Sequence, residues 1–353
     1  MQPVMTGRRR LRRSAALTAA TLAGLALAAC GSSGSTAASS ASSSSAGTAA
    51  KALNIAYLSF AVENSYDAPM LAAAQAVASD NHATLKVFDA NNSPQTQYSQ
   101  LQDAITSGQY NGIIVQPIFG TGLTGLVKQA ISKGIKVVNL DQILGPDLST
   151  DKPQVPGLSA NVTFVPTDIG TKLGTLVVQA CKAKNLSPCK VGYLYDIKAS
   201  ALDVAIHGAF AKAIAADPAV KVVAQGQSFF SPTEGLTAVQ NMLQANPGLN
   251  LIVGSDQGIE GGAQALQSAH LTDKVILVGY GASAAALAGV SSGAWYADVA
   301  QAPASEGRLA VQALVAALRT GKNSGGIDPV AQLPNGGVVT KANVAQFTAE
   351  WPG

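Results

Sequence analysis

Residues 112–141 have the sequence GIIVQPIFGTGLTGLVKQAISKGIKVVNLD. An apolar run rich in isoleucine and valine at 112–116 is followed by a helical pattern at 123–133 and by a second apolar run at 136–140. Two short buried strands separated by a helix form the unit of a parallel sheet, because the helix carries the chain back to the edge where the next strand starts. This stretch therefore predicts a βαβ unit in an α/β fold.

The same alternation continues on both sides of this unit. Further strands are expected at 53–58, 84–88 and 158–164, with helices at 68–80, 94–107 and 168–184. A second series then has strands at 190–195, 220–224, 249–254, 275–280 and 295–300, with helices at 201–216, 233–245, 259–269 and 304–319. Since the pattern occurs twice, we predict two doubly wound parallel-sheet lobes in series.

The first thirty residues have the features of an export signal. Five arginines precede an apolar run at 15–29, which ends in Leu27-Ala-Ala-Cys30. The segment resembles a bacterial lipoprotein signal, and we predict that residues 1–29 are removed and that Cys30 carries the lipid. An ordinary signal peptide or a membrane anchor is the alternative, although about 15 apolar residues are fewer than the roughly 20 that span a bilayer.

Composition after this signal limits the kinds of partner. Residues 30–51 are almost wholly Ser, Gly, Ala and Thr, which predicts a flexible tether. Without the five arginines, 18 of the 23 Lys and Arg remain against 20 Asp and Glu, so the net charge changes from +3 to −2. A chain with no basic tract is not expected to bind nucleic acid.

Ligands of open α/β sheets bind at the carboxyl ends of the strands, so the residues directly after each strand are candidate contacts. In this chain they are mostly amides, hydroxyls, carboxylates and aromatic rings: Ser59, Phe60, Asn91, Asn92, Gln116, Asp141, Gln142, Asp196, Ser255, Asp256, Tyr280 and Gln301. Amides and carboxylates match the hydroxyls of a small ligand, and aromatic faces cover its C–H surface. The pattern predicts a neutral, polyhydroxylated ligand of the sugar or sugar-alcohol class.

Six segments in order resemble the ribose-binding-protein-like branch of the type I periplasmic binding proteins: Leu53–Ser59, Gly112–Pro117, Val137–Asp141, Ile252–Asp256, Val278–Tyr280 and Ala297–Gln301. The resemblance implies an extracytoplasmic, monomeric solute receptor of an ABC importer, without a cofactor, whose partners are a small ligand and a membrane permease. It also implies lobes at 52–163 plus about 302–328 and at 164–301 plus about 329–353. Hinge crossovers are expected near 160–166, 279–283 and 300–303, and they close the lobes on the ligand.

At some positions this sequence matches the residues that contact the ligand in this family, and at others it does not. Asn64 matches a ligand-contacting Asn, Tyr66 keeps the aromatic ring that follows it, and Asp141 matches a signature carboxylate. Gln301 matches a Gln near the hinge, and Phe230 is expected to face the cleft. The predicted ligand contacts are Ser59, Asn64, Tyr66, Gln116, Asp141, Gln142, Phe230, Ser255, Asp256 and Gln301.

Several positions depart from the family pattern. Gln142, and either Ile206 or His207, stand where sugar-binding members carry Arg, and Gly281 stands where an Asp is frequent. Asp67 replaces a common second aromatic residue. Glutamine cannot copy the rigid fork of donors that arginine offers, so the ligand is not expected to be ribose.

Other motifs give no catalytic or metal site. Gly120-Thr-Gly122-Leu-Thr-Gly125 fits the G-x-G-x-x-G dinucleotide pattern, but three residues separate it from the strand, and it lies in the third βα unit of its lobe rather than the first. The three histidines, His82, His207 and His270, have no metal-ligand spacing. No Ser/His/Asp or Cys/His arrangement indicates an enzyme.

A pair of cysteines and one long loop also allow structural predictions. Cys181 and Cys189 flank a helix end and a turn, and in an oxidising exterior they are expected to form a disulfide, since a redox role lacks a C-x-x-C spacing. The loop at 142–157 has three prolines and is long for its place, which suggests that it forms part of the cleft rim.

The leading function is therefore a solute receptor held at the outer face of the cell membrane by lipid on Cys30. A sensory receptor of the same fold, which presents a signal molecule or nucleoside to a membrane sensor, is the alternative. Both functions need the same ligand trap, so the sequence does not separate them.

Overall fold

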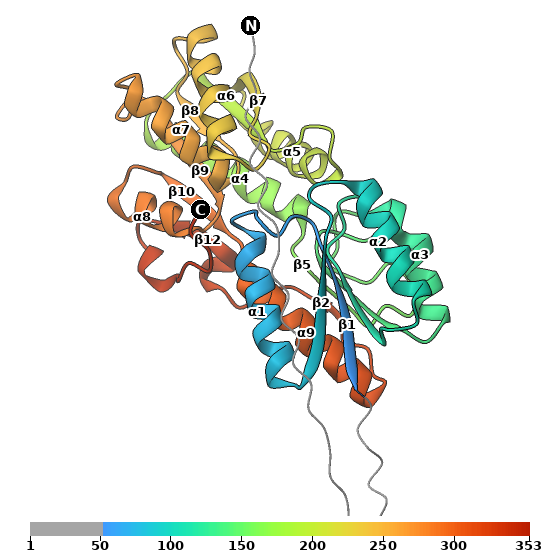
Figure 1. Ribbon diagram of the computed structural model, residues 1–353. Helices are drawn as coiled ribbons and strands as arrows, with labels where there is room; N and C mark the ends of the chain where they lie inside the picture. The colour runs from blue at the N-terminus through green and yellow to red at the C-terminus, as the bar shows by residue number, and fades with distance from the viewer. Residues whose placement is uncertain (1–51) are drawn as a thin grey trace, which may run out of the picture. The chain divides into compact units, whose positions relative to one another are not determined.

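The computed structural model describes residues 52–353, and the predicted signal, the tether and Cys30 lie outside the described residues. Within the described residues the chain forms two six-stranded sheets, with strand orders β11-β5-β4-β3-β1-β2 and β12-β10-β9-β8-β6-β7 (Figure 1). Among residues 52–353, no helix combines the length and the apolar character that a membrane crossing needs.

The first lobe is the first sheet with the helices that cover it. Its strands are all parallel: β1 (Leu53–Ser59), β2 (Ala83–Asp89), β3 (Gly112–Val115), β4 (Lys136–Asp141), β5 (Ala160–Thr163) and β11 (Gly325–Ile327). One face packs against α1 (Asp67–Asp80) and α9 (Pro303–Thr320), and the other against α2 (Pro94–Thr106) and α3 (Gly120–Ser132). Strands with both faces covered explain why residues 113–115 form a continuous buried run.

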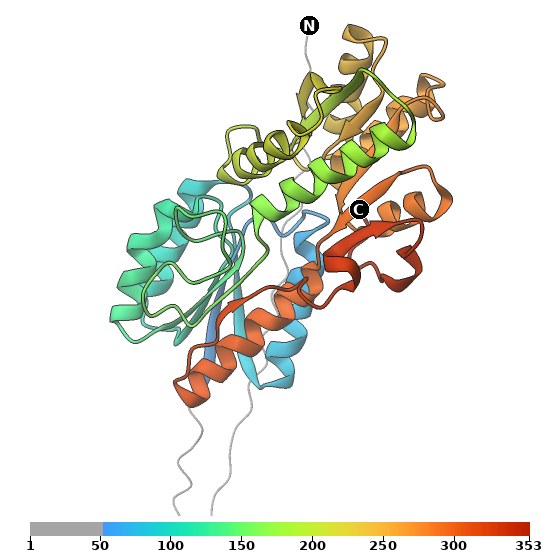
Figure 2. The same cartoon turned by 180° about the vertical axis from the view of Figure 1, so that it is seen from behind.

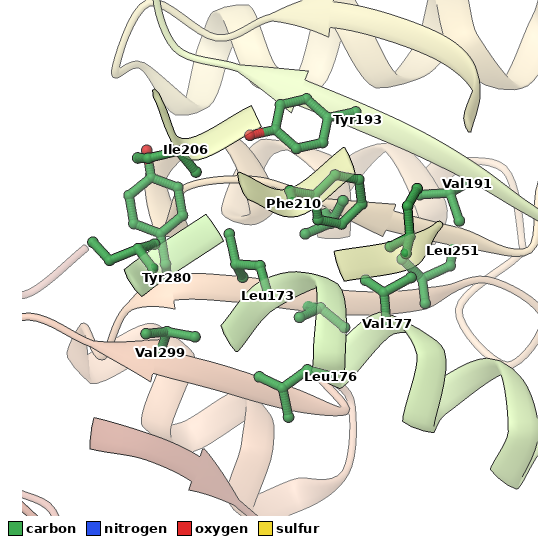
Figure 3. Close-up of a cluster of buried hydrophobic side chains, with 14 of the residues drawn as sticks. Leu173, Leu176, Val177, Val191, Tyr193, Ile206, Phe210, Leu251, Tyr280 and Val299 are labelled. Carbon is green, nitrogen blue, oxygen red and sulfur yellow. The ribbon is translucent and has the colours of Figure 1, made fainter. Parts of the chain in front are cut away.

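The second lobe repeats this plan. Its strands are β6 (Cys189–Tyr195), β7 (Val220–Gln227), β8 (Leu251–Val253), β9 (Ile276–Gly281), β10 (Ala297–Ala300) and β12 (Val338–Thr340), and only β12 pairs antiparallel. The helices are α4 (Pro166–Ala183), α5 (Ala201–Ile214), α6 (Pro232–Ala245), α7 (Asp256–Ser268) and α8 (Ala284–Ser292). Figure 3 shows how Leu173 of α4 and Phe210 of α5 pack with Leu251 of β8 in the core under two of these helices. These two lobes confirm the predicted fold class.

Between residues 52 and 353 the chain passes from one sheet to the other three times. It does so between β5 and α4, between β10 and α9, and between β11 and β12. Figure 2 shows the last passage from behind, as the orange-red segment that leaves the first sheet after α9 and enters the second. The crossover expected near 279–283 is wrong, because β9 and α8 on either side of it belong to the second lobe; the third passage lies at 328–337.

The elements that the sequence did not predict are short. Helix α8 has the sequence AAALAGVSS, in which small residues give no amphipathic pattern, and β11 and β12 have three residues each. Segments this short carry too few residues for a periodic signal. The two strands are defined by pairing with strands that are distant in the sequence, β11 with β5 and β12 with β10.

The glycine-rich motif at 120–125 has a packing role. Gly120 begins α3, and a Cβ atom built on it would lie 2.0 Å from the carbonyl oxygen of Ile143. The loop that starts at Gln142 runs across this helix end, and its Leu144 and Val155 are buried in the first-lobe core. The glycine therefore permits a close approach between a helix and a loop.

Cys181, in the last turn of α4, is linked by a disulfide to Cys189, the first residue of β6. Both residues are buried beside the core of the second lobe. The bridge therefore closes the turn between a covering helix and a central strand of that sheet.

Gly120→Ala is expected to destabilise the protein by about 1–3 kcal/mol, because the new methyl group meets backbone that cannot move alone. Gly125→Ala is the matched control: it lies in the same helix, a Cβ atom at this position would have no neighbour within 4 Å, and alanine should stabilise the helix by about 0.5–1 kcal/mol. Urea unfolding measures both free energies. Equal values for the two variants would contradict the packing role of Gly120.

Candidate functional site

A cavity lies between the two lobes, at the carboxyl ends of the strands. It holds about 510 Å³ of empty space, open solvent at its mouth included. Residues from both sheets line it: Phe60, Asn64, Tyr66, Asp67, Gln116, Asp141, Gln142, Phe164, Leu202, Phe230, Ser255, Gln257, Tyr280, Gln301 and Trp351. This is the place where open α/β sheets bind ligands.

The side chain of Gln116, directly after β3, organises the first-lobe side of the cavity. Its Oε1 accepts a hydrogen bond of 3.0 Å from the backbone N–H of Phe60, which fixes the orientation of the amide. The Nε2 group must then face the other way, where it donates to Asp67 at 2.7 Å and to Asp141 at 3.1 Å. One buried amide thus holds two carboxyl groups together.

The end of β4 has an unusual backbone that serves this site. In an extended strand, consecutive side chains point to opposite faces of the sheet. Asp141 has a φ of +64°, a left-handed conformation, and its neighbour Gln142 also lines the cavity and donates to Asp141 at 3.3 Å. Thr163 donates to the carbonyl of Asp141 and so stabilises this turn. Backbone strain placed at a cleft is typical of binding sites.

Three buried carboxyl groups, Asp67, Asp141 and Glu306, lie close together here, and we call them the acidic cluster. Burial, and after it the charge of Asp141, raises the pKa of Asp67 to about 8. Burial raises the pKa of Asp141 to about 6, although hydrogen bonds from Gln116 and Gln142 oppose the change. Burial and Asp141 also hold the pKa of Glu306 well above its usual range, and Tyr66 donates to Glu306 at 3.0 Å.

On the second-lobe side, Asp196 positions two of the lining residues. Its Oδ1 accepts hydrogen bonds of 2.6 Å from both Ser228 and Ser255, and its Oδ2 accepts one of 2.6 Å from the hydroxyl of Tyr280. Asp196 is fully buried and does not itself line the cavity. Its role is to fix the side chains of Ser255 and Tyr280.

Aromatic rings form two edge-to-face pairs at the cavity. Phe60 of the first lobe meets Phe230 of the second, with ring centroids 6.4 Å apart. Tyr66 meets Trp351, near the C-terminal end of the chain, at 5.3 Å. Such rings cover apolar faces of a ligand and exclude water.

Trp351 explains the absence of an acid at position 281. Its Nε1 donates to the carbonyl oxygen of Gly281 at 2.8 Å. A Cβ atom on Gly281, whose φ is +144°, would lie 2.5 Å from the Trp351 ring and 2.7 Å from Asp256. A tryptophan from the C-terminal segment therefore occupies the space that a side chain at position 281 would need.

Polar contacts also join the lobes directly. The amide of Gln257, in the first turn of α7, donates to Asn64 at 3.2 Å and to the hydroxyl of Ser65 at 3.0 Å. With the Phe60–Phe230 pair, these contacts join the two lobes beside the cavity.

The structure brings eight of the ten predicted contact residues to the cavity: Asn64, Tyr66, Gln116, Asp141, Gln142, Phe230, Ser255 and Gln301. Ser59 is not among the lining residues, because its side chain is buried beneath the end of β1. Asp256 lies behind the cavity, where it accepts from the backbone N–H of Ser283 at 2.7 Å. The prediction that Ser59 and Asp256 contact the ligand is therefore corrected, because neither side chain lines the cavity.

Residues at the expected arginine positions bring no charge to the cavity. Ile206 is buried in the second-lobe core, and the ring of His207 packs on Tyr193 at 4.7 Å. Burial and the nearby Lys198 lower the pKa of His207. The loop at 142–157 was expected to form part of the cleft rim. Of its residues, Gln142 alone is among those that line the cavity, so this expectation holds for Gln142 and not for the rest of the loop.

The sequence did not select Asp67, Phe164, Leu202, Gln257 or Trp351 as contacts. Asp67 begins a helix rather than following a strand, and Gln257 lies one position beyond the predicted Asp256. Trp351 has no local signal at all, because its role depends on contacts with distant parts of the chain.

Comparison with known proteins agrees with this geometry. A family model for the periplasmic binding protein domain matches residues 55–323. The chain belongs to this family. The D-allose-binding periplasmic protein of Escherichia coli is 28% identical over 224 residues, which are 63% of this chain and 70% of that protein. The ribose import binding protein of Bacillus subtilis is 25% identical over 228 residues, 64% of this chain and 69% of that protein.

A solved structure of an ABC transporter periplasmic solute-binding protein from Actinobacillus succinogenes, with bound D-allose, has the same fold. Its TM-score is 0.71 at 22% identity, and the match covers 84% of this chain and 100% of that one. The relatives are named as binding proteins, which confirms the prediction that this periplasmic binding protein is not an enzyme.

The ligand-free binding protein is expected to lose stability as the pH rises from about 5 to 8. The pKa of Asp67 is about 8 in the folded state against an ordinary value of 3.8, so within this window the folded state binds more protons than the unfolded state. The free energy of unfolding therefore falls as the pH rises through it.

Urea unfolding at several pH values measures this slope. Asp67→Asn cannot titrate and should show a shallower fall than the wild type, whereas Asp80→Asn, on the exposed end of α1, should follow the wild type. Identical slopes for Asp67→Asn and the wild type would contradict the assignment.

Proposed function

We propose that this protein is the solute-binding component of an ABC importer and that its ligand is a small polyhydroxylated solute of the sugar or sugar-alcohol class. The observation that supports this most is the composition of the cavity, in which amide, carboxyl and hydroxyl groups alternate with aromatic rings from both lobes. Such a lining matches many hydroxyl groups and an apolar ring face at once. The sugar-binding names of the relatives support the same ligand class.

Capture by hinged closure is the second part of the proposal. The passages at 163–166 and 300–303 are only a few residues long, which suits a hinge in which little backbone must change. Opening would separate Gln257 from Asn64 and Phe230 from Phe60, and a ligand in the cavity would favour the closed arrangement by contacting both lobes. A membrane permease would then recognise the closed form.

Attachment to the membrane is the third part. We infer that lipid on Cys30 anchors the protein and that residues 30–51 form the tether. An anchored receptor stays close to its membrane partner, and this raises the effective concentration of the loaded form at the permease.

A thermal-shift panel of sugars, sugar alcohols and cyclitols tests the ligand class. A ligand at 100 times its dissociation constant should add about 2.7 kcal/mol to the free energy of unfolding. Asp141→Ala should abolish the response because it removes a carboxylate from the cavity, whereas Asp80→Ala, the same change at the surface, should keep it. Silence across the whole panel, with a response to amino acids or inorganic anions, would overturn the proposed class.

Cys30→Ala should release the full-length protein from the membrane fraction of a bacterial expression host, because the lipid would have no attachment site. Ser33→Ala, three residues further along, is the control and should stay with the membrane. Detergent phase partition and membrane sedimentation measure the distribution. Membrane retention of Cys30→Ala would show that another segment anchors the chain.

A further inference from the structure

The ligand cavity is acidic and has no basic counterpart. Asp67 and Asp141 line it, and Glu306 lies behind Tyr66. Of the described residues that line the cavity, none is Lys, Arg or His. The two ion pairs found within residues 52–353, Lys172–Asp168 and Lys182–Asp217, involve other groups.

Ionising both carboxyl groups in this cavity is costly in the absence of a cation. A buried carboxylate needs hydrogen bonds and an opposite charge to offset its lost hydration. The Nε2 group of Gln116 is shared between Asp67 and Asp141. Asp141 has one further donor, the amide of Gln142 at 3.3 Å, and Asp67 has the backbone N–H of Ala61, so every donor to the two acids is uncharged. Glu306 is fully buried, and among residues 52–353 its Oε2 has no hydrogen-bond partner. One carboxylate oxygen of the acidic cluster is therefore left unpaired by the described part of the protein, and no positively charged side chain lines the cavity beside Asp67 and Asp141.

We propose that the solute carries an amino group, as in an amino sugar or an aminocyclitol, and that its ammonium ion binds between Asp67 and Asp141. This rests on the proposed function and departs from the neutral ligand expected from the sequence. The ammonium supplies three donors and the missing positive charge. The hydroxyl groups of the solute would bind the amides of Asn64, Gln142 and Gln257.

Aromatic rings line the same cavity as the two carboxyl groups. Tyr66 and Trp351 form an edge-to-face pair that lines the cavity, and Tyr66 is in sequence next to Asp67. A cation over an aromatic face gains electrostatic stabilisation, most of all where water is excluded. A metal ion is a poorer fit, because no group of three or more His, Cys, Asp or Glu in the described part of the chain has the arrangement of a metal site.

Binding of an ammonium ion should release a proton from the protein, whereas binding of a neutral solute should not. The ionisable groups that face Asp67 are Asp141, Glu306, Tyr57 and Tyr66, and Asp89 is further away. With a pKa of about 8, Asp67 holds a proton at pH 7 in the empty protein. When the ammonium ion binds, Asp67 ionises and its proton passes to the solvent, while the ammonium keeps its three protons.

Calorimetric titration of the wild-type protein with matched pairs tests the proposal. Each pair is a neutral compound and its monoamino analogue, such as D-glucose with D-glucosamine, D-galactose with D-galactosamine, and myo-inositol with a monoaminoinositol. For the best pair, the amino member should bind at least about tenfold more tightly at pH 7. Titration in buffers of different ionisation enthalpy should show release of about one proton for that member alone.

Asp67→Asn keeps the shape of the side chain and removes its charge. It should lose the preference for the amino member and the proton release, whereas Asp80→Asn, exposed at the other end of α1, should keep both. Thermal unfolding establishes that both variants are folded before titration.

The outcomes separate this inference from the proposed function. Equal or tighter binding of the neutral member in every responsive pair overturns the amino ligand and leaves the sugar-binding function standing. Retention of the preference and of proton release in Asp67→Asn also overturns the inference. Silence from both members of every pair overturns the inference and the proposed function together.

Discussion

The buried amide of Gln116 is the contact on which the binding site depends. Its oxygen is held by the backbone of Phe60 and its nitrogen by Asp67 and Asp141, so the end of β1, the start of α1 and the end of β4 meet on one side chain. A second buried glutamine, Gln97, supports it by donating to the carbonyl oxygen of Gln116 at 2.7 Å. Because an amide has one acceptor end and one donor end, fixing the first determines what the second can bind. The orientation of Gln116 therefore turns its donor end toward the two carboxyl groups.

Two lobes of the same architecture contribute differently to the cavity. In the second lobe, the carboxylate of Asp196 is withdrawn behind the lining and satisfied by Ser228, Ser255 and Tyr280. In the first lobe, Asp67 and Asp141 stand in the lining and share the amide nitrogen of Gln116, and Asp141 also accepts from Gln142. A fully bonded buried carboxylate is a structural device, whereas an incompletely bonded one stores free energy that a ligand can recover. The first lobe thus places two carboxyl groups in the cavity lining, whereas the second places its bonded carboxylate behind the lining.

The sequence predicted the parts of the molecule that have local signals. The strands gave clear apolar runs, and their carboxyl ends identified residues such as Gln116 and Asp141, because parallel sheets bring those ends to one edge. The sequence did not predict site residues whose role depends on contacts with distant parts of the chain. Trp351 bonds to Gly281, 70 positions away, and Gln257 to Asn64, 193 positions away, and no short pattern encodes either pairing. The expected lobe bounds at about 328 and 329 imply the passage at 328–337, but the expected crossovers named 279–283 in its place, since the three-residue strands on either side of the passage are defined only by their partners.

The C-terminal segment connects the ligand cavity with the passage at 300–303. Glu350 accepts a hydrogen bond of 2.7 Å from the backbone N–H of Ser305, in the first turn of α9, which belongs to the first lobe. The next residue, Trp351, donates to Gly281 at the end of β9, in the second lobe, and packs against Tyr66 in the cavity. Two adjacent residues thus contact both lobes on either side of one passage. Because Trp351 also lines the cavity, the hinged closure proposed above would change the shape of the cavity surface at this segment.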